Sequence, residues 1–467
     1  MRDSVWLCGL VVVILSGCVS SPEVVEKPEN LPVPVSWYAP VDGAENQDQV
    51  WWDAFSSVEL GALLEEALGE NPDLQAMSAR VEAASASVRI AGAGLYPSVS
   101  AGLDGARRKQ NFIGFPIPGS TSNVLSTQAT SYGLSLATSW ELDLWGRVRA
   151  GKRAAIADSE AARSDFEMQQ MSLAAQVSKS WVNAIAAREQ LMLARASASS
   201  FEETANKIEE RYEQGLRSAL EFKLSVNSVE SAKALVVDRR QQLLQALLQL
   251  ELLLGRYPSG MLELEGGLPE LIGAMSVGIP SSVLERRPDL VAAERRLAAA
   301  DQRLWESRAA LFPQISLSGS TGTSTAELRD VLDTDFSVWT LAGNLAQPIL
   351  QGGRLRAGVD LSKSKIKEAT FQYVSTALRA FSEVEFGLAS EGFLRDREVH
   401  ILAAAAQSES ALVLANRRYE SGLEELINVL ESQRRSLSDG TQVILIRQAR
   451  LNNRIDLYLA LGGSVEK

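Results

Sequence analysis

Residues 71–100 read NPDLQAMSARVEAASASVRIAGAGLYPSVS, and residues 287–316 read RPDLVAAERRLAAADQRLWESRAALFPQIS. Aligned without gaps, 11 of these 30 positions are identical. The motif Arg-Tyr-Glu-x-Gly-Leu at 211–216 likewise recurs at 418–423. A long internal repeat is the sequence signature of a duplicated unit, so we expect the chain to contain two structural repeats.

Each copy alternates helix-like and strand-like sequence in the same order. Residues 59–94 and 282–310 are rich in Ala, Leu, Arg and Glu, and Pro97 and Pro313 are expected to end these helices. Two proline-free stretches of 70 residues each would form helices about 105 Å long. They cover 145–214 and 352–421, and shorter helices are expected at 218–254 and 424–461. These lengths predict a column of long antiparallel helices.

Between the helices of each copy, the hydrophobic period changes from that of a helix to two, which is the period of a strand. Long alternating runs occupy 132–144 and 339–349, and shorter ones occupy 99–103 and 315–317. This pattern predicts two strands per copy and four in all. One face is apolar and aromatic, and the other is small and polar. Apolar and polar side chains also alternate in the sheets of soluble proteins. A β-barrel with a water-filled lumen, however, requires a polar face of this kind.

Three aromatic residues lie near the ends of the longest alternating run: Tyr132, Trp140 and Trp145. Aromatic girdles mark both membrane interfaces of transmembrane barrels, so we expect these residues at the rims of a barrel. The alternative is that they pack in the protein interior.

The N-terminus has the pattern of an export signal. An apolar run ends in Leu15-Ser16-Gly17-Cys18, which resembles a bacterial lipobox. The resemblance implies that residues 1–17 are a lipoprotein signal peptide and that Cys18 is lipidated. Val19 follows Cys18, which favours the outer membrane over retention in the inner membrane. Proline-rich residues 18–50 are expected to form an extended tether.

Composition excludes several functional classes. The 467 residues include a single histidine, His400, and two cysteines, so no cluster of Cys and His is available to build a metal site, and neither a metal nor a cofactor is expected. His400 lies within a predicted helix without a partner motif, which argues against an enzyme. The net charge of −12 and the absence of a basic block argue against nucleic-acid binding.

The expected elements require partners. Four strands cannot close a barrel around a lumen, and open strand edges are not tolerated in lipid. Long helices also need neighbours that cover their apolar stripes. Either the strands form a soluble sheet, or several chains pool them in a ring-shaped oligomer. The domain boundaries predicted along the chain are a first repeat at 51–254, a linker at 255–280 and a second repeat at 281–467.

The paired motifs resemble the TolC-like outer-membrane factor family, in particular the lipoprotein branch of drug-efflux channels similar to OprM and NodT. The resemblance extends from Trp51 to Gly462. The residues that carry it are Trp51-Trp52, Asn71-Pro72-Asp73-Leu74, Leu95-Tyr96-Pro97, Leu142-Asp143-Leu144-Trp145-Gly146-Arg147, Arg286-Arg287-Pro288-Asp289-Leu290, Leu311-Phe312-Pro313, Gln347-Pro348-Ile349 and Gly352-Gly353-Arg354.

The resemblance implies an α+β membrane protein in which a long α-helical barrel continues into a transmembrane β-barrel. Four strands per protomer would give twelve in a homotrimer. The channel would be lipid-anchored in the bacterial outer membrane, with a large periplasmic domain. It would serve as the passive exit duct of a tripartite pump for drugs or other small molecules, and so contribute to antibiotic resistance. Its partners would be a periplasmic adaptor and an inner-membrane transporter, of the RND type or similar. The alternatives are a type I protein-secretion channel and a periplasmic adaptor lipoprotein.

The helix that follows Gly422 in the second copy is expected to carry a gate. After the turn at Gly422, Ile427, Glu431 and Arg434 are spaced by four and three residues, so they share one helix face. In the related efflux channels, this face narrows the closed periplasmic mouth with an apolar residue, a carboxylate and a partnering arginine. The resemblance assigns these roles to Ile427, Glu431 and Arg434. The alternative is an ordinary surface pair.

Overall fold

The computed structural model of this chain describes residues 33–39, 51–113, 124–271 and 279–463. The chain divides into two compact units, and several helices contribute residues to both. Among the described residues, the first unit contains 82–113, 124–161 and 294–372, and the second contains 33–39, 51–81, 162–271, 279–293 and 373–463.

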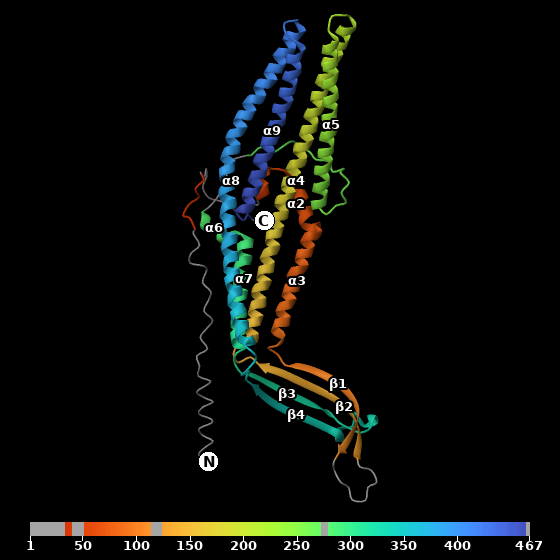
Figure 1. The fold of residues 1–467 in the computed structure, drawn as a ribbon, viewed down its shortest axis with the longest axis vertical. Coiled ribbons are helices and arrows are strands. Elements are labelled where there is room, and N and C mark those ends of the chain that lie inside the picture. The colour runs from red at the N-terminus through yellow and green to blue at the C-terminus, as the bar shows by residue number, and fades with distance from the viewer. Residues whose placement is uncertain (1–32, 40–50, 114–123, 272–278, 464–467) are drawn as a thin grey trace. The chain divides into compact units, whose positions relative to one another are not determined.

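The first unit contains a four-stranded antiparallel sheet whose strands follow one another in chain order (Figure 1). The strands are β1 (Ser98–Ile113), β2 (Val124–Leu142), β3 (Gln314–Thr323) and β4 (Ser337–Ala346). The prediction of two strands per copy is therefore confirmed for the described residues. Pairing between β2 and β3 joins the two copies, with Leu136 opposite Thr321.

The two faces of this sheet differ in chemistry. Because antiparallel partners share a face, the pairing carries the alternation of β2 across the sheet. The apolar face carries Val99, Leu103, Tyr132, Leu134, Leu136, Trp140, Leu317, Trp339, Leu341 and Leu345. The opposite face carries Ser98, Ser100, Ser135, Ala137, Ser139, Ser318, Ser320, Thr340 and Ala342.

Two glycines allow close approaches within the sheet. A Cβ atom at Gly105 would lie 3.3 Å from the ring of Tyr132, so the missing side chain leaves room for that ring. A Cβ atom at Gly322 would lie 2.0 Å from the carbonyl oxygen of Leu134, which only glycine avoids.

Helices make up the remaining regular structure, apart from short 3₁₀ turns. The first copy forms α2 (Val58–Glu70), α3 (Pro72–Ala93), α4 (Arg147–Glu213) and α5 (Ala219–Leu253), and the second forms α6 (Pro280–Arg286), α7 (Pro288–Ala309), α8 (Arg354–Glu420) and α9 (Leu426–Ala460). The long helices α4 and α8 have 67 residues each, close to the expected 70. None of the helices in the described residues is long and apolar enough to span a membrane.

The expectation of one continuous helix at 59–94, and of another at 282–310, was wrong. Both stretches break before a proline, at Asn71 and at Arg287, where ψ is 122° and 120°. The proline ring excludes the helical conformation at the preceding residue, so each stretch becomes two helices. Asn71 then caps α3, because its side chain accepts hydrogen bonds from the backbone N–H groups of Asp73 and Leu74.

The repeated Arg-Tyr-Glu-x-Gly-Leu motif ends both long helices. Gly215 and Gly422 have φ values of +72° and +74°, which favour glycine. The N–H of Leu216 donates to the carbonyl of Arg211 at 2.8 Å, and the N–H of Leu423 donates to that of Arg418 at 2.9 Å. These bonds reverse the chain into α5 and α9, so α4–α5 and α8–α9 are antiparallel pairs (Figure 1).

The second unit also holds part of the N-terminal segment. Trp37 is 8% exposed and packs edge-on against Phe381 of α8, with ring centroids 6.4 Å apart. The Glu385 carboxylate accepts the N–H groups of Tyr38 at 2.9 Å and Ala39 at 3.0 Å. Residues 33–39 are therefore docked on α8, a contact that the expected tether at 18–50 did not include.

Candidate functional site

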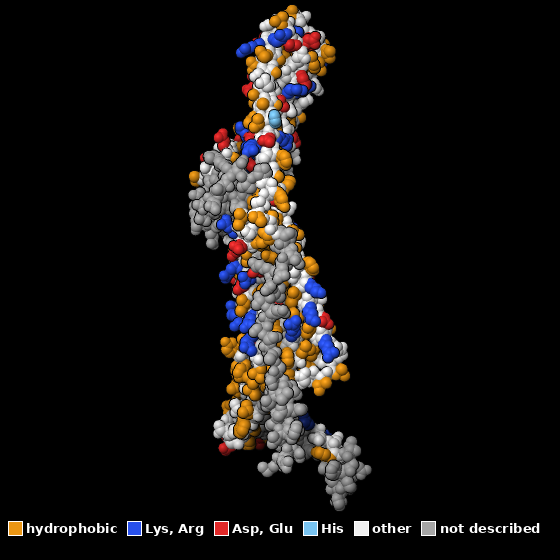
Figure 2. All heavy atoms as spheres, turned by 90° about the vertical axis from the view of Figure 1, so that its left-hand side faces the viewer, with side chains coloured by type: hydrophobic (Ala, Val, Ile, Leu, Met, Phe, Trp, Pro, Cys, Tyr) orange, Lys and Arg blue, Asp and Glu red, His pale blue; other side chains and the backbone are white. Residues whose placement is uncertain are grey.

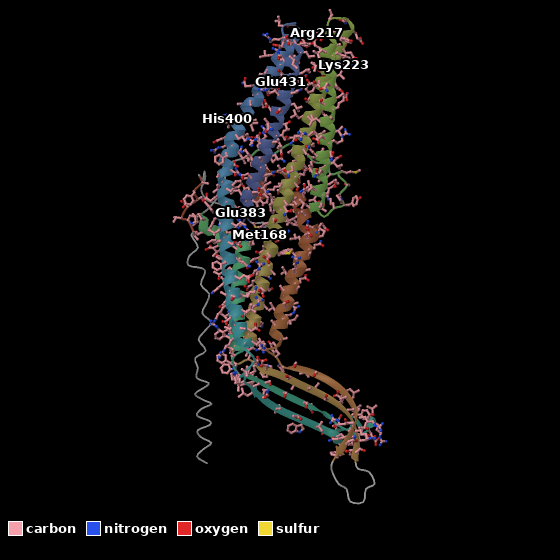
Figure 3. All side chains as sticks on the ribbon, in the orientation of Figure 1. Met168, Arg217, Lys223, Glu383, His400 and Glu431 are labelled. Atoms are coloured by element: carbon pink, nitrogen blue, oxygen red, sulfur yellow. The ribbon has the colours of Figure 1, made fainter. Side chains whose placement is uncertain are left out.

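The proposed gate residues lie on the first turns of α9, beside the α8–α9 turn. Ile427 is 47% exposed, and Glu431 and Arg434 are also exposed. Figure 3 shows Glu431 on α9 close to that turn, with Arg217 beside the corresponding α4–α5 turn. The opposite side of α9 is buried through Leu426, Val429 and Leu430, which form one cluster with α4 and α5. This packing leaves the side of α9 that carries Ile427 and Glu431 open.

Arg434 has a different partner from the one expected. Its guanidinium donates to Ser228 Oγ of α5 at 3.2 Å. No ion pair joins Arg434 to Glu431 within the described part of the chain. The adjacent Gln433 is buried and donates to Ser200 and Thr204 of α4, which fixes the rotation of α9 and directs Arg434 toward α5.

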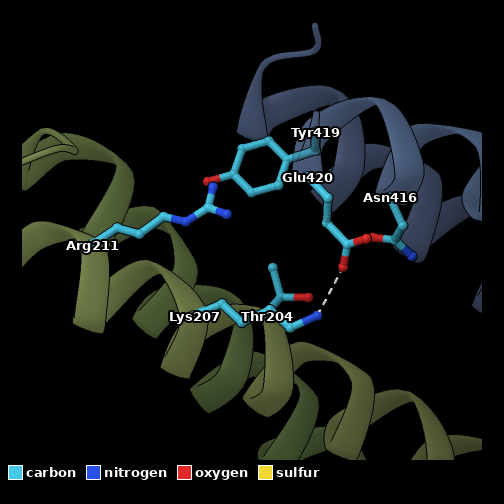
Figure 4. A pocket seen from close by; sticks show the side chains of 6 residues that line it. All are labelled: Thr204, Lys207, Arg211, Asn416, Tyr419 and Glu420. Atoms are coloured by element: carbon cyan, nitrogen blue, oxygen red, sulfur yellow. Dashed lines mark hydrogen bonds and ion pairs between the residues drawn. The ribbon is translucent and has the colours of Figure 1, made fainter. Parts of the chain in front are cut away.

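A contact between the two helix pairs lies nearby, in a small pocket (Figure 4). The ammonium group of Lys207 on α4 lies 3.0 Å from the carboxylate of Glu420 on α8. Tyr419 is 5% exposed, and the Arg217 guanidinium lies 4.8 Å from the centre of its ring, within the range of a cation–π contact. We define Lys207, Arg217, Tyr419 and Glu420 as the inter-pair contact.

The two copies differ at this point, although their motifs are the same. Tyr212, the counterpart of Tyr419, stacks on Phe222 of α5 within its own helix pair, with ring centroids 5.2 Å apart. The second tyrosine instead faces across to α4. In the sequence, the repeated motif indicated only the end of a helix. The tyrosine at its second position is the feature that could have indicated this contact.

The three aromatic residues of the strand region are partly buried. Trp140 Nε1 donates to the carbonyl of Leu95 at 3.1 Å, and Trp145 Nε1 donates to that of Pro313 at 2.6 Å. Trp145 also stacks on Phe312, with ring centroids 5.2 Å apart. Tyr132 lies on the apolar face of the sheet. The indole N–H groups are thus satisfied within the protein, while each ring keeps part of its surface exposed.

The junction between β2 and α4 explains the Leu-Asp-Leu-Trp-Gly-Arg motif. Asp143 accepts the backbone N–H groups of Val148 at 3.0 Å and Arg149 at 2.9 Å, so it satisfies two donors at the start of α4. Arg147 pairs with Glu141 at 2.8 Å. The hydrogen bond to Glu141 raises the pKa of Arg147 above its ordinary value, and burial opposes this.

The remaining predictions concern His400, metal binding and Cys18. His400 is exposed on α8, where Figure 3 labels it. No cluster of three or more His, Cys, Asp or Glu side chains that could hold a metal occurs among the described residues. Cys18 lies outside the described residues.

Comparison with known proteins identifies the family. The family model of outer membrane efflux proteins matches residues 63–256 and 279–463, which are most of the chain. This chain belongs to the outer membrane efflux protein family. Members of this family are channels of the outer membrane rather than enzymes.

Individual relatives extend over nearly the whole chain. The pyoverdine export outer membrane protein OpmQ of Pseudomonas aeruginosa is 33% identical, over 96% of this chain and 94% of its own length. Outer membrane protein OprJ of the same species is 34% identical, over 97% and 94%. Among solved structures, the open state of the MtrE outer membrane channel of Neisseria gonorrhoeae matches with a TM-score of 0.83 and 28% identity, over 95% of this chain and 98% of its own. The predicted fold, a helical barrel with a β-barrel, is thereby confirmed.

Proposed function

We propose that three copies of this chain form the exit duct of a tripartite efflux pump, through which small molecules leave the periplasm passively. The observation that carries the proposal is the four-stranded sheet of an outer-membrane protein, with an apolar face and a face of small polar residues. Three such sheets give twelve strands, enough to surround a water-filled lumen. Closure also pairs the free edges of β1 and β4, which lipid does not tolerate.

Exposed apolar side chains on the helices support association of several copies. Phe386 and Phe393 of α8 are seven residues apart, which places them on one helix face, and both are about three-quarters exposed. Figure 2 shows further hydrophobic side chains uncovered between charged ones on the face that it draws. A neighbouring protomer would cover such side chains.

The source of energy is an inner-membrane transporter, joined to the duct by a periplasmic adaptor.

Small molecules are the proposed cargo, because the relatives are named for export of pyoverdine, toluene or antibiotics. Purified wild-type chain should form stable channels in a planar lipid bilayer. Deletion of its gene should make cells more sensitive to small toxic compounds, and expression from a plasmid should restore resistance. A chain that never conducts, despite folding into trimers, would contradict the duct. Restored secretion of a protein without restored resistance would favour the type I secretion channel.

We further propose that Ile427 and Glu431 narrow the periplasmic mouth of the trimer, with Arg434 as the residue that ties α9 to α5. Support comes from the exposure of Ile427 and Glu431 on one side of α9 and from the bond of Arg434 to Ser228. Three carboxylates in a ring favour cations, and three isoleucines form an apolar constriction. Opening of the mouth would move α8–α9 away from α4–α5. The ion pair between Lys207 and Glu420 would then have to break.

The double variant Ile427→Ala with Glu431→Ala tests this gate. Single-channel conductance should rise and cation selectivity should weaken, because both the apolar constriction and the charge ring are removed. The matched control is Leu220→Ala with Leu224→Ala, at the corresponding positions on α5 of the first copy. Unchanged conductance and selectivity in the first double variant would refute the gate and leave the duct itself intact.

A further inference from the structure

Basic side chains stand at the end of β1 that is remote from the helices. Arg107, Arg108 and Lys109 are consecutive and exposed. Pairing of β1 with β2 is uninterrupted from Ser98 to Ile113, so the alternation of faces holds along the whole strand. Arg107 and Lys109 therefore continue the apolar face that carries Leu103, whereas Arg108 lies on the opposite, small polar face.

The distance of these residues from the helix end of the sheet can be estimated from the register. Ten residue steps separate Leu142, where β2 ends, from Tyr132. At about 3.3 Å per residue and a tilt of about 40°, they rise about 25 Å, the height of the apolar band of an outer-membrane barrel. Tyr132 thus stands at the outer rim of this band, in the position of an interfacial aromatic residue.

Arg107 and Lys109 lie just beyond that rim. Arg107 is opposite Thr130, and Lys109 is opposite Gln128, two and four residues past Tyr132. The same geometry places them about 5 and 10 Å outside the apolar band, which is the depth of lipid headgroups. The Arg107 guanidinium donates to Gln128 Oε1 at 3.2 Å, which holds it on this face.

Charge also distinguishes this site. Within the described residues, no carboxylate lies at ion-pair distance from Arg107 or Lys109, so both cations are available to an anion. The neighbouring acidic side chain on β1, Asp104, is on the opposite face. Two outward cations next to an aromatic rim residue match the arrangement by which membrane proteins bind phosphorylated lipid headgroups.

We propose that Arg107 and Lys109 bind the phosphate groups of an anionic glycolipid in the outer leaflet of the outer membrane. This proposal rests on the barrel proposed above, because only closure of the sheet turns its apolar face toward lipid. A guanidinium binds a phosphate through two parallel hydrogen bonds, and the ammonium two positions along adds a point charge. Each trimer would carry three such sites around its outer rim.

The test compares Arg107→Gln with Lys109→Gln, as a double variant, against Arg108→Gln as the matched control on the other face. Detergent-purified trimers are titrated with lipid A, and bound lipid is counted by native mass spectrometry. The double variant should bind lipid A roughly 25-fold more weakly, which corresponds to a loss of about fivefold per cation. The control should bind like the wild type, and chemically dephosphorylated lipid A should bind all three proteins weakly.

Other outcomes would overturn the proposal. Equal loss of lipid A binding in the double variant and in Arg108→Gln would show that general charge, rather than this face, is responsible. Equally tight binding of phosphatidylglycerol would exclude selectivity for the glycolipid, and competition by inorganic phosphate would point to a free-anion site. Bilayer conductance is measured for every variant. A double variant that still conducts shows that the duct is intact. A failed prediction of lipid A binding then counts against the lipid site alone.

Discussion

An arginine at Leu136 provides a quantitative test of the two faces of the sheet. Leu136 is on β2, between strands β1 and β3, and is 49% exposed on the apolar face. It lies six residues from Leu142 and four from Tyr132, which is near the middle of the proposed band. An arginine at the midplane costs about 2–4 kcal/mol, or about 6–12 kcal/mol for a trimer.

Ser135→Arg is the matched control, because Ser135 precedes Leu136 and lies on the small polar face. The assay is refolding of urea-unfolded protein into lipid vesicles, with trimer formation followed by gel mobility without heating. Leu136→Arg should shift the midpoint of the urea transition strongly, and Ser135→Arg should shift it little, since its side chain meets water. Equal loss at both positions, or greater loss at Ser135, would refute the assignment of faces.

Three further perturbations have defined outcomes. Cys18→Ala should abolish labelling by radioactive fatty acid, yet the protein should still insert as a trimer when exported with a non-lipoprotein signal; a soluble monomer would contradict the barrel. Trp37→Ala should expose residues 33–39 to hydrogen exchange, because removing a buried aromatic side chain costs about 3–5 kcal/mol; Tyr38→Ala, at an 89% exposed position, should not. Burial opposes ionisation of Glu391, but its bonds to Arg450 and the charge of Arg454 outweigh burial and lower the pKa of Glu391 below 4.5. The ionised carboxylate therefore stabilises the folded state at pH values above 4.5, and this stabilisation is lost as the pH falls through the lowered pKa of Glu391. The melting temperature of wild type should therefore drop more steeply in acid than that of Glu391→Gln, and parallel curves would exclude this role.

Local patterns in the sequence predicted the elements of the fold well. Alternation over 132–144 identified the C-terminal part of β2, and the absence of proline from 352–421 identified α8. The helix-ending glycines, Gly215 and Gly422, were recognised because their motif is repeated. Each of these signals lies within a few residues of what it specifies, which is why a single sequence is sufficient.

Contacts between distant residues could not be predicted in this way. Arg434 bonds to Ser228, more than two hundred residues earlier, and nothing in the spacing of α9 favours this partner over Glu431. Tyr419 and Tyr212 occupy the same place in identical motifs but contact different helices. The breaks at Asn71 and Arg287 were missed for another reason: the helical composition continues through them, and one proline outweighs it.

Docking of the N-terminal segment has a consequence for the order of events in synthesis. Ala39 and its acceptor Glu385 are separated by 346 residues. At the usual rate of translation, roughly 20–70 s pass between the synthesis of Ala39 and that of Glu385. During that time, Trp37 has no α8 surface to pack against. Residues 37–39 therefore cannot dock until this part of α8 has been made. Formation of this contact therefore requires that the chain has been made at least as far as Glu385.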